Sequence, residues 1–446
     1  MSSPSADPVV SAATMTGMFN IIPLIVTVLL AASPNQRFGL SEPMPRLDGT
    51  IRLASYNVLN FFDQTDDPRL QGEYDDFGDN PGPTTDERCR TLADVIRAVD
   101  ADVLALQEVE SKEAITWFRD NYLADMGYDY IASEDVGYYR GVEQSLLSRF
   151  PIRDVKTWTS ANLDRVKRVG GGWDEVPADK TNIRFQRSPL CATVKTPEGY
   201  ELTLFVMHHK SGRSRWHREA EALQVMEYVA AMLKKDPDRN IAILGDFNAQ
   251  PWDRSMQVYL RGGMIDSMTC RNHNLDHGDA SPVCKTHTSD RLIDFILLNH
   301  GATGELVTGS GFVLGTSAEE YDWRNNPIPP GYASDHYPIA VDLVPVDGAG
   351  STVESEAWPR SAMGNALKGY RPKATTSGSA SSSSSKSSSQ ASVDGEFVAS
   401  ARSKVFHKAD CHNAKKISKK NIVKYDSSGK AENDGRRLAG CCKSGS

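Results

Sequence analysis

The segment Ile241–Pro251 constrains the fold more than any other stretch of this sequence. Its apolar run, Ile-Ala-Ile-Leu, ends at Gly245 and is followed at once by Asp246 and Asn248. An apolar run without polar alternation is typical of a strand that is buried on both faces. Asp246 and Asn248 are two residues apart, so both side chains can face one cleft. Gly, Asp and Asn are also ordinary turn formers, so this segment alone leaves a simple turn open.

Polar side chains mark the ends of several other predicted strands. They are Asn57 after the strand from Ile51, Glu108 after the strand from Asp102, His208 after the strand from Leu202, Asp294 within the strand 290–298, and Asp335 with His336 before the last strand. Because loops at one edge of an α/β sheet converge on the binding cleft, we expect these side chains to lie close together. Asp294 interrupts an apolar strand, where a carboxylate is costly unless it is paired, and His336 is its expected partner.

Helical patterns alternate with the strands. Thr84 and Glu87 form a capping box before one apolar stripe, and a second helix is expected from about Ser111 to Leu123. The longest expected helix, Ser211–Leu233, begins among cations that oppose the helix dipole: Lys210, Arg213, Arg215 and Arg218. They indicate either phosphate binding or a solvated basic face. The order of strands and helices predicts a layered α/β fold.

The residue types at these strand ends support phosphate chemistry. Glu108 and neighbouring carboxylates would hold Mg²⁺, which prefers carboxylate oxygen, with Mn²⁺ or Ca²⁺ as alternatives. His336, backed by the buried Asp294, is a suitable general base for activating water. The expected donors to the phosphoryl oxygens are His208, Asn57 and Asn248.

Two consecutive histidines end the strand from Leu202, and alternation separates them. His208 shares a face with Leu204 and Val206, whereas His209 lies opposite. We therefore expect His208 to contribute to the chemistry and His209 to packing.

The order and spacing of these motifs resemble one known family. Ser55-Tyr-Asn57, Leu106-Gln-Glu108, Gly245-Asp246-Phe-Asn248, Leu292-Ile-Asp294 and Ser334-Asp335-His336 are the motif set of the endonuclease/exonuclease/phosphatase superfamily, which includes DNase I. The resemblance covers about Ile51 to Val344. It implies a four-layer α/β sandwich, in which helices flank two facing mixed β-sheets, and a metal-dependent phosphoric ester hydrolase.

The resemblance also implies roles for single residues. Glu108 would be the principal Mg²⁺ ligand, with Asp335 and Asn57 on the metal side. Asp246 and Asn248 would act at the nucleophile and phosphate, and Asp294 would orient His336. His208, aligned by the Lys210-Ser211 that follows it, takes the phosphate-side histidine position, and Glu143 resembles the carboxylate that pairs with that histidine in DNase I-like members.

Composition divides the 446 residues into segments. They are a polar amino terminus (1–17), an apolar segment (18–33), the main domain (51–345), a Ser-rich flexible linker (346–393) and a basic Cys/His module (394–446). The apolar segment is too short for a comfortable transmembrane helix and fits a signal-peptide core, although no Lys or Arg precedes it. An uncleaved anchor is the alternative. We expect export, whether the protein is secreted, periplasmic or anchored.

The carboxy-terminal module resembles small Ada-type zinc-binding modules that accompany secreted nucleases. The four ligands would be His407, Cys411, Cys441 and Cys442. Adjacent cysteines on one ion are geometrically awkward, so a disulfide from Cys411 to one of the last two is the alternative.

These features predict a secreted Mg²⁺-dependent nuclease acting on DNA or RNA. The alternative is a phosphatase or phosphodiesterase acting on a lipid or inositol phosphate, as sphingomyelinases do. The complete motif set argues against a catalytically inactive binding module. The basic module favours nucleic acid, although the whole chain has a net charge of −8. No sequence feature requires a protein partner, and the oligomeric state is left open.

Overall fold

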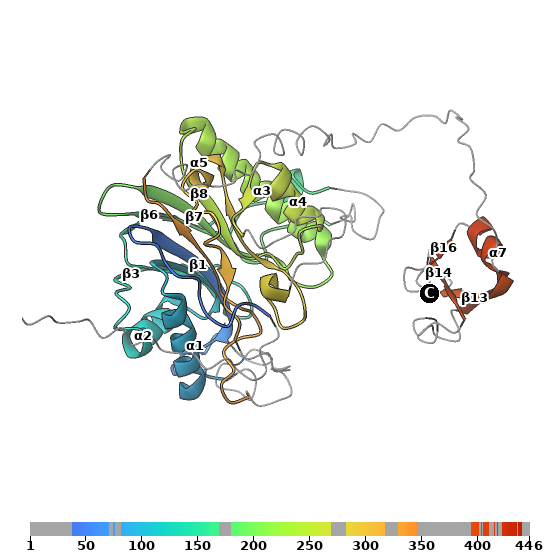
Figure 1. The fold of residues 1–446 in the computed structure, drawn as a ribbon, viewed down its shortest axis with the longest axis horizontal. Helices are drawn as coiled ribbons and strands as arrows, with labels where there is room; N and C mark the ends of the chain where they lie inside the picture. Colours follow the sequence, from blue (N-terminus) through green and yellow to red (C-terminus); the bar gives the residue numbers. More distant parts are fainter. Residues whose placement is uncertain are drawn as a thin grey trace, which may run out of the picture. The chain divides into compact units, whose positions relative to one another are not determined.

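The computed structural model describes most of the main domain and part of the carboxy-terminal module. The described residues are 38–70, 75, 82–168, 180–268, 282–316, 329–346, 394–400, 403, 405–409, 414, 417, 422–434 and 436–438. The chain divides into two compact units, residues 1–371 and 372–446, which are described separately (Figure 1). Among the described residues, no helix is both long and apolar enough to cross a membrane. The expected signal or anchor segment, residues 18–33, lies outside them.

Two six-stranded mixed sheets form the centre of the main unit. The first has the order β11 (Phe312–Val313), β12 (Ile339–Leu343), β1 (Ile51–Phe61), β2 (Val103–Val109), β4 (Glu143–Ser148), β3 (Tyr130–Ser133). The second has the order β5 (Ile152–Lys156), β6 (Leu190–Lys195), β7 (Glu201–His208), β8 (Ile241–Asp246), β10 (Asp294–Leu298), β9 (Ile265–Asp266). In each sheet two neighbouring central strands are parallel, β1 with β2 and β7 with β8, and the strands beyond them are antiparallel.

Helices cover the outer face of each sheet (Figure 1). The helices are α1 (Asp86–Val99), α2 (Lys112–Tyr122), α3 (Arg215–Lys235), α4 (Arg254–Arg261) and the short α5 (His300–Thr303), with 3₁₀ turns η1 (Leu163–Arg165) and η2 (Pro282–Cys284). Leu53, Leu204 and Val341 belong to the core between the sheets. Apolar residues of α1 and α2 pack on the first sheet, and those of α3 and α4 pack on the second. This arrangement confirms the predicted four-layer sandwich.

Local details at the helix starts differ from the sequence predictions. The N-cap of α1 is Thr85, whose side chain accepts a hydrogen bond from the Arg88 amide. The predicted capping box of Thr84 and Glu87 was therefore wrong, since the residue three after the N-cap is Arg88, which cannot accept the reciprocal hydrogen bond. Thr84 instead accepts a hydrogen bond from the Phe62 amide at 3.0 Å. Helix α3 begins at Arg215, and Arg218 points inward, with its Nη1 donating to the Lys210 carbonyl at 2.9 Å. Arg218 is 4% exposed, so it belongs to neither a solvated face nor an open phosphate site.

The carboxy-terminal unit contains a small four-stranded sheet of its own. Its order is β15 (Ile422–Ser427), β13 (Asp394–Ser400), β14 (Val405–Lys408), β16 (Arg437–Leu438), and the helix α7 (Ser428–Asn433) follows β15. Phe397 and Phe406 form a buried edge-to-face pair whose ring centroids are 5.4 Å apart. The sheet therefore has a small apolar core of its own.

Candidate active site

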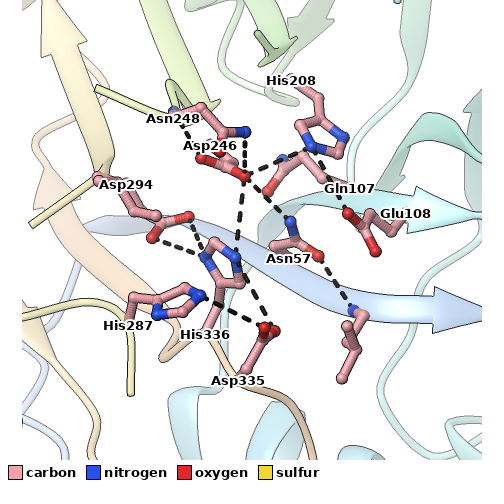
Figure 2. A network of polar contacts seen from close by, with 12 residues as sticks. Asn57, Gln107, Glu108, His208, Asp246, Asn248, His287, Asp294, Asp335 and His336 are labelled. Atoms are coloured by element: carbon pink, nitrogen blue, oxygen red, sulfur yellow. Dashed lines mark hydrogen bonds and ion pairs between the residues drawn. The ribbon is translucent and has the colours of Figure 1, made fainter. Parts of the chain in front are cut away.

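The predicted strand-end residues meet where the two sheets face each other (Figure 2). β10 and β12 run antiparallel to β8 and β1, so their amino ends lie beside the carboxyl ends of the parallel strands. The residues that gather there are Asn57, Glu108, His208, Asp246, Asn248, Asp294, Asp335 and His336. The predicted convergence of separate strand ends is therefore present in the structure.

Asp246 lies at the centre of this cluster and is 2% exposed. Its Oδ2 accepts hydrogen bonds from Asn248 Nδ2 at 2.9 Å and from Asn57 Nδ2, on the facing sheet, at 3.3 Å. Burial raises the pKa of Asp246 to about 6, since the lowering effect of His336 is opposed by the negative charge of Asp294. A carboxylate with this pKa can accept a proton near neutral pH.

The backbone around Asp246 explains the residue types beside it. Gly245 has a φ of +140°, and a Cβ atom there would collide with the Met207 carbonyl on β7. Only glycine lets β7 and β8 approach so closely. Asn248 has a left-handed φ of +47°, and its amide donates to Asp246 Oδ1 at 2.7 Å. Asn tolerates this conformation better than most residues, so the motif turns the chain while it holds the carboxylate.

Glu108 reaches the site through a distortion of β2. Leu104 and Leu106 face the helices of the first sheet, and simple alternation would direct Glu108 the same way. Instead, the pairing of β2 with β4 shifts register here, and Glu108 has a left-handed φ of +64°. The bulge turns the carboxylate so that Oε1 lies 3.6 Å from His208 Nε2, while Oε2 accepts the Asn60 amide at 2.9 Å.

His336 and Asp294 form the buried pair that the sequence predicts. His336 Nδ1 lies 3.1 and 3.0 Å from the two carboxylate oxygens of Asp294, and its Nε2 lies 3.8 Å from Asp246. Burial alone would lower the pKa of His336, but the charges of Asp294, Asp246 and Asp335 together raise it to about 10. The ring is therefore an imidazolium at neutral pH and donates from Nδ1 to Asp294.

The two histidines that end β7 face opposite sides, as alternation predicts. His208 Nε2 lies 3.4 Å from Asp246 Oδ2 in the site. Burial, assisted by the charge of Arg187, holds the pKa of His208 well below its usual range, so this ring is neutral. His209 points away from the site, and its Nδ1 contacts Glu221 Oε2 at 2.7 Å.

The expected pairing of Glu143 with His208 is not found. Among the described residues, the carboxylates within ion-pair distance of His208 are Glu108 and Asp246, and Glu143 Oε2 has no hydrogen-bond partner. Glu143 pairs in the sheet with Val109, which follows the bulge at Glu108. Glu108, rather than Glu143, is the carboxylate that lies against the His208 imidazole. Burial raises the pKa of Glu143 to about 8, so this carboxyl group is mostly protonated at neutral pH.

A buried polar network lies behind the site on the other face of β7. Glu221 of α3 accepts hydrogen bonds from the amides of Gln186 at 2.8 Å and Lys210 at 3.0 Å, besides its contact with His209. His209 Nε2 lies 2.8 Å from the Tyr259 hydroxyl of α4. The network ties both helices to the end of β7, so we infer that it positions the backbone on which His208 stands.

Arg187 is a site residue that the sequence analysis missed. It is 2% exposed, its Nε donates to the His208 carbonyl at 3.1 Å, and its Nη2 donates to the His209 carbonyl at 2.6 Å. Nη1 is buried with no hydrogen-bond partner in the part of the chain that the structure describes, and the guanidinium lies 4.8 Å from the centre of the Tyr138 ring. A single arginine in a loop before β6 carries no periodic signal, so pattern analysis could not identify it.

Arg140 and His287 were also missed. Arg140 Nη2 lies 3.3 Å from Glu108 Oε2 and contacts the Asn60 side chain. His287 Nε2 lies 3.3 Å from Asp335 Oδ2. Both residues come from loops, where neither alternation nor strand ends indicate the direction of a side chain.

The donor set fits a divalent cation. Ligand atoms of Asp246 and Asp294 lie within 4.8 Å of each other and of His336, and Asp335 lies within 4.8 Å of His336 and His287. His336, which is protonated on both ring nitrogens, would not itself ligate the cation, so the carboxylates are the candidate ligands. Asp335 Oδ1 is buried and has no hydrogen-bond partner among the described residues, which is typical of a carboxylate oxygen in a cation site. Carboxylate oxygens suit Mg²⁺, Mn²⁺ and Ca²⁺, so the donor chemistry supports a divalent cation without selecting one. The assignment of Glu108, Asp335 and Asn57 as ligands stays a prediction.

The expected zinc ligands of the carboxy-terminal unit cannot be compared as a group. His407 lies on β14, where it is half-buried and pairs with Val398 of β13. Cys411, Cys441 and Cys442 lie outside the described residues. The zinc site and the alternative disulfide therefore both stay predictions.

Comparison with known proteins identifies the family. The model of the Endonuclease/Exonuclease/phosphatase family matches residues 54–336, which is more than half of the chain. The matched range includes the whole cluster from Asn57 to His336. The protein belongs to the endonuclease/exonuclease/phosphatase family and is a metal-dependent phosphoric ester hydrolase. A comparison with curated proteins found no match.

Several solved structures resemble the fold. The catalytic domain of human Nocturnin with bound sulfate is 18% identical with a TM-score of 0.41, and the match covers 66% of this chain and 94% of that one. A mannosyl-6-phosphatase from Bacteroides thetaiotaomicron is 18% identical with a TM-score of 0.41, covering 66% and 99%. Truncated TDP2 from Caenorhabditis elegans is 14% identical with a TM-score of 0.38, covering 66% and 97%. The family assignment rests on the family model and on the site.

Proposed function

We propose that this enzyme is an exported, Mg²⁺-dependent nuclease that hydrolyses phosphodiester bonds of DNA or RNA. One observation carries the catalytic part of the proposal. Buried Asp246, with its raised pKa, lies between the neutral His208 and the imidazolium of His336. A proton acceptor flanked by two hydrogen-bond donors is the arrangement that attack of water on a phosphoryl group requires.

A divalent cation held by Glu108 and Asp335, with Asn57 beside them, would polarise the phosphoryl group and neutralise its developing charge. The protein's own residues would handle the proton. The sequence analysis expected His336 to be the general base, but its raised pKa makes it a poor acceptor at neutral pH. Asp246, with a pKa of about 6, suits that role better, and His336 is better suited to donate to a phosphoryl oxygen.

The proposed reaction is a direct displacement by water. The water oxygen bonds to phosphorus and its proton passes to Asp246, while the ester P–O bond breaks and the leaving oxygen takes up a proton from solvent. The neutral His208 imidazole would donate a hydrogen bond to a phosphoryl oxygen. The side-chain amide of Asn248 donates to Asp246 Oδ2 at 2.9 Å and to the His209 carbonyl at 3.2 Å, so it would donate to the substrate on giving up one of these contacts. Asp294 holds the His336 ring in one orientation throughout, through contacts at 3.0 and 3.1 Å.

The choice of nucleic acid rests on the carboxy-terminal unit. Lys and Arg outnumber Asp and Glu in residues 394–446, whereas the whole chain is acidic. A basic module on a Ser-rich linker can raise the local concentration of a polyanion near the site. A lipid or inositol phosphate would not need such a module, so nucleic acid is the better-supported substrate.

The test compares substrates on the purified full-length protein. Supercoiled plasmid, single-stranded RNA, sphingomyelin vesicles and an inositol phosphate are incubated with and without Mg²⁺, and the His336→Ala variant is the control for contaminating activity. We expect Mg²⁺-dependent cleavage of DNA or RNA by the wild type and almost none by the variant. Faster hydrolysis of sphingomyelin or the inositol phosphate would reject the nuclease proposal in favour of that substrate.

Export is a separate part of the proposal and rests on the apolar segment, residues 18–33. Fractionation of the native host with an antibody against the main unit tests it. Amino-terminal sequencing of the exported protein would distinguish a cleaved signal from an anchor. Protein found wholly in the cytoplasm, with an intact amino terminus, would reject export.

A further inference from the structure

His287 lies at the accessible edge of the site, and neither the sequence motifs nor the proposed reaction uses it. Its backbone is held against Arg291 and His336, and its ring centroid is 4.6 Å from that of His336 (Figure 2). The side chain is 12% exposed, so it is confined by its surroundings but not sealed from solvent.

Ser289 fixes the tautomer of the His287 ring. The Ser289 amide donates to Nδ1 of His287 at 2.9 Å, and a backbone N–H can only donate. The Ser289 hydroxyl lies 2.8 Å from the same nitrogen and itself accepts from Arg291 Nε at 2.7 Å. The hydroxyl proton is therefore free to point at Nδ1. Two donors on Nδ1 leave it without a proton, so the neutral ring carries its proton on Nε2.

This tautomer argues against a metal site formed by His287, Asp335 and His336. Their ligand atoms lie within 4.8 Å of one another, which by distance alone would suit a cation. A cation on His287 Nε2 would require the proton to move to Nδ1, where it would meet both donors of Ser289. The geometry therefore makes His287 a hydrogen-bond donor rather than a metal ligand.

Asp335 is only a weak hydrogen-bond acceptor for the Nε2–H group of His287. Asp335 Oδ2 lies 3.3 Å from His287 Nε2, which is long for a hydrogen bond to a carboxylate. The Nε2–H group thus has a weak partner in the free protein and a position beside His336, where the phosphoryl group would bind.

We propose that His287 is a substrate-binding residue whose Nε2–H donates to a phosphoryl oxygen of the bound phosphoric ester. The inference rests on the proposed function and deepens it, because it names a group that contacts the substrate from outside the family's motif set. A preoriented neutral donor stabilises charge that develops on the phosphoryl oxygens. It adds no positive charge to the site, so it serves phosphodiesters, which carry one negative charge, as well as more highly charged esters.

The first measurement determines the tautomer in the wild-type protein and uses a variant only to assign the signal. Full-length protein labelled with ¹⁵N-histidine is examined by long-range ¹H–¹⁵N NMR, with the His287 signal assigned by its loss in His287→Gln. We expect the Nε2–H tautomer both in the metal-free protein and after addition of Mg²⁺. An Nδ1–H tautomer, or a change of tautomer on addition of Mg²⁺, would overturn the proposal in favour of metal ligation.

The second measurement uses His287→Ala, with His287→Gln as the variant that keeps a donor amide and exposed His300→Ala as the matched control. For His287→Ala we expect a loss of about a hundredfold in kcat/KM on bis(p-nitrophenyl) phosphate, as for removal of one preorganised donor. Binding of inorganic phosphate to the Mg²⁺-loaded protein should weaken in parallel. The Mn²⁺ affinity, measured by electron paramagnetic resonance, should be unchanged, and His287→Gln should recover most of the activity.

A tenfold loss of Mn²⁺ affinity in His287→Ala, or a kcat/KM equal to that of His300→Ala, would reject the proposal. If His287→Ala does not fold, the comparison of His287→Gln with the wild type and the NMR measurement still decide it. The model phosphodiester and inorganic phosphate report on His287 whether or not nucleic acid is the natural substrate. A failure of the nuclease proposal is therefore distinguishable from a failure of this one.

Discussion

Replacing Glu221 with Gln tests whether the buried network behind the site stabilises the fold. Glu221 is fully buried, and its two oxygens accept from His209 Nδ1 and from the amides of Lys210 and Gln186. Gln has nearly the same shape but offers one acceptor oxygen and one NH₂ group. That NH₂ group would face a donor, so at least one buried hydrogen bond is lost together with the negative charge.

The size of the loss follows from the pKa of Glu221. Burial raises it, but the hydrogen bond from His209 and the charge of His217 overcome burial and lower it from 4.5 to about 2. Because the pKa in the folded state is depressed, the stabilisation is present above the unfolded value and is lost as pH falls toward 2. A shift of this size corresponds to about 3 kcal/mol at pH 7. Breaking a buried charge pair costs about 3–5 kcal/mol, which agrees with it.

The assay is urea unfolding of the wild type and the variant, followed by tryptophan fluorescence at pH 7 and pH 3. We expect Glu221→Gln to lose about 3 kcal/mol at pH 7 and less than half of that at pH 3. Glu227→Gln is the matched control on the same helix, where the ion pair with Arg165 is solvent-accessible and is worth less than about 1 kcal/mol. Equal losses for the two variants at pH 7, or a loss for Glu221→Gln that does not change with pH, would refute the reasoning.

Three further predictions concern activity. Glu108→Gln should remove most activity and raise the Mg²⁺ concentration needed for half-maximal rate, with an unchanged circular dichroism spectrum; unchanged metal dependence would exclude it as a ligand. In the wild type, kcat/KM should rise with pH through about 6, as Asp246 loses its proton, and fall near pH 10, as His336 loses its proton. Asp294→Asn should lower the rate about a hundredfold or more and move the alkaline fall of the profile to lower pH. A pH–rate series measures both effects. Deletion of residues 394–446 should weaken binding of long DNA and flatten its salt dependence but leave turnover of a short phosphodiester unchanged; an unaltered salt slope in a binding titration would remove the reason for preferring nucleic acid.

The pairing of Asp294 with His336 could be predicted because it follows from energetics. A carboxylate in an apolar strand must have a partner, and His336, before the last strand, was the expected one. The structure places the two groups 3.0 Å apart. The different roles of His208 and His209 could be predicted from strand geometry, because side-chain direction alternates strictly in a regular strand.

Glu108 shows where such reasoning fails. Its residue type and its place after a buried strand indicated a role in the site, but alternation directs it toward the helices. Only the bulge, with a φ of +64°, turns it to His208 and leaves Glu143 out of the predicted pair. A bulge depends on how two strands align, so it cannot be predicted from the sequence of one strand alone.

His208 and His336 show that neighbouring charges account for the difference between two buried histidines. The two rings are 2% and 5% exposed, so burial disfavours the charged form of both. Three carboxylates around His336 outweigh burial and raise its pKa, whereas Arg187 and Arg140 act with burial on His208 and lower its pKa. The site therefore holds one cationic and one neutral imidazole on opposite sides of Asp246. Burial alone favours a neutral ring at both positions, and the difference comes from charges on other strands and loops. Exchanging the roles of the two histidines would therefore require moving those charges, and substituting the rings alone could not achieve it.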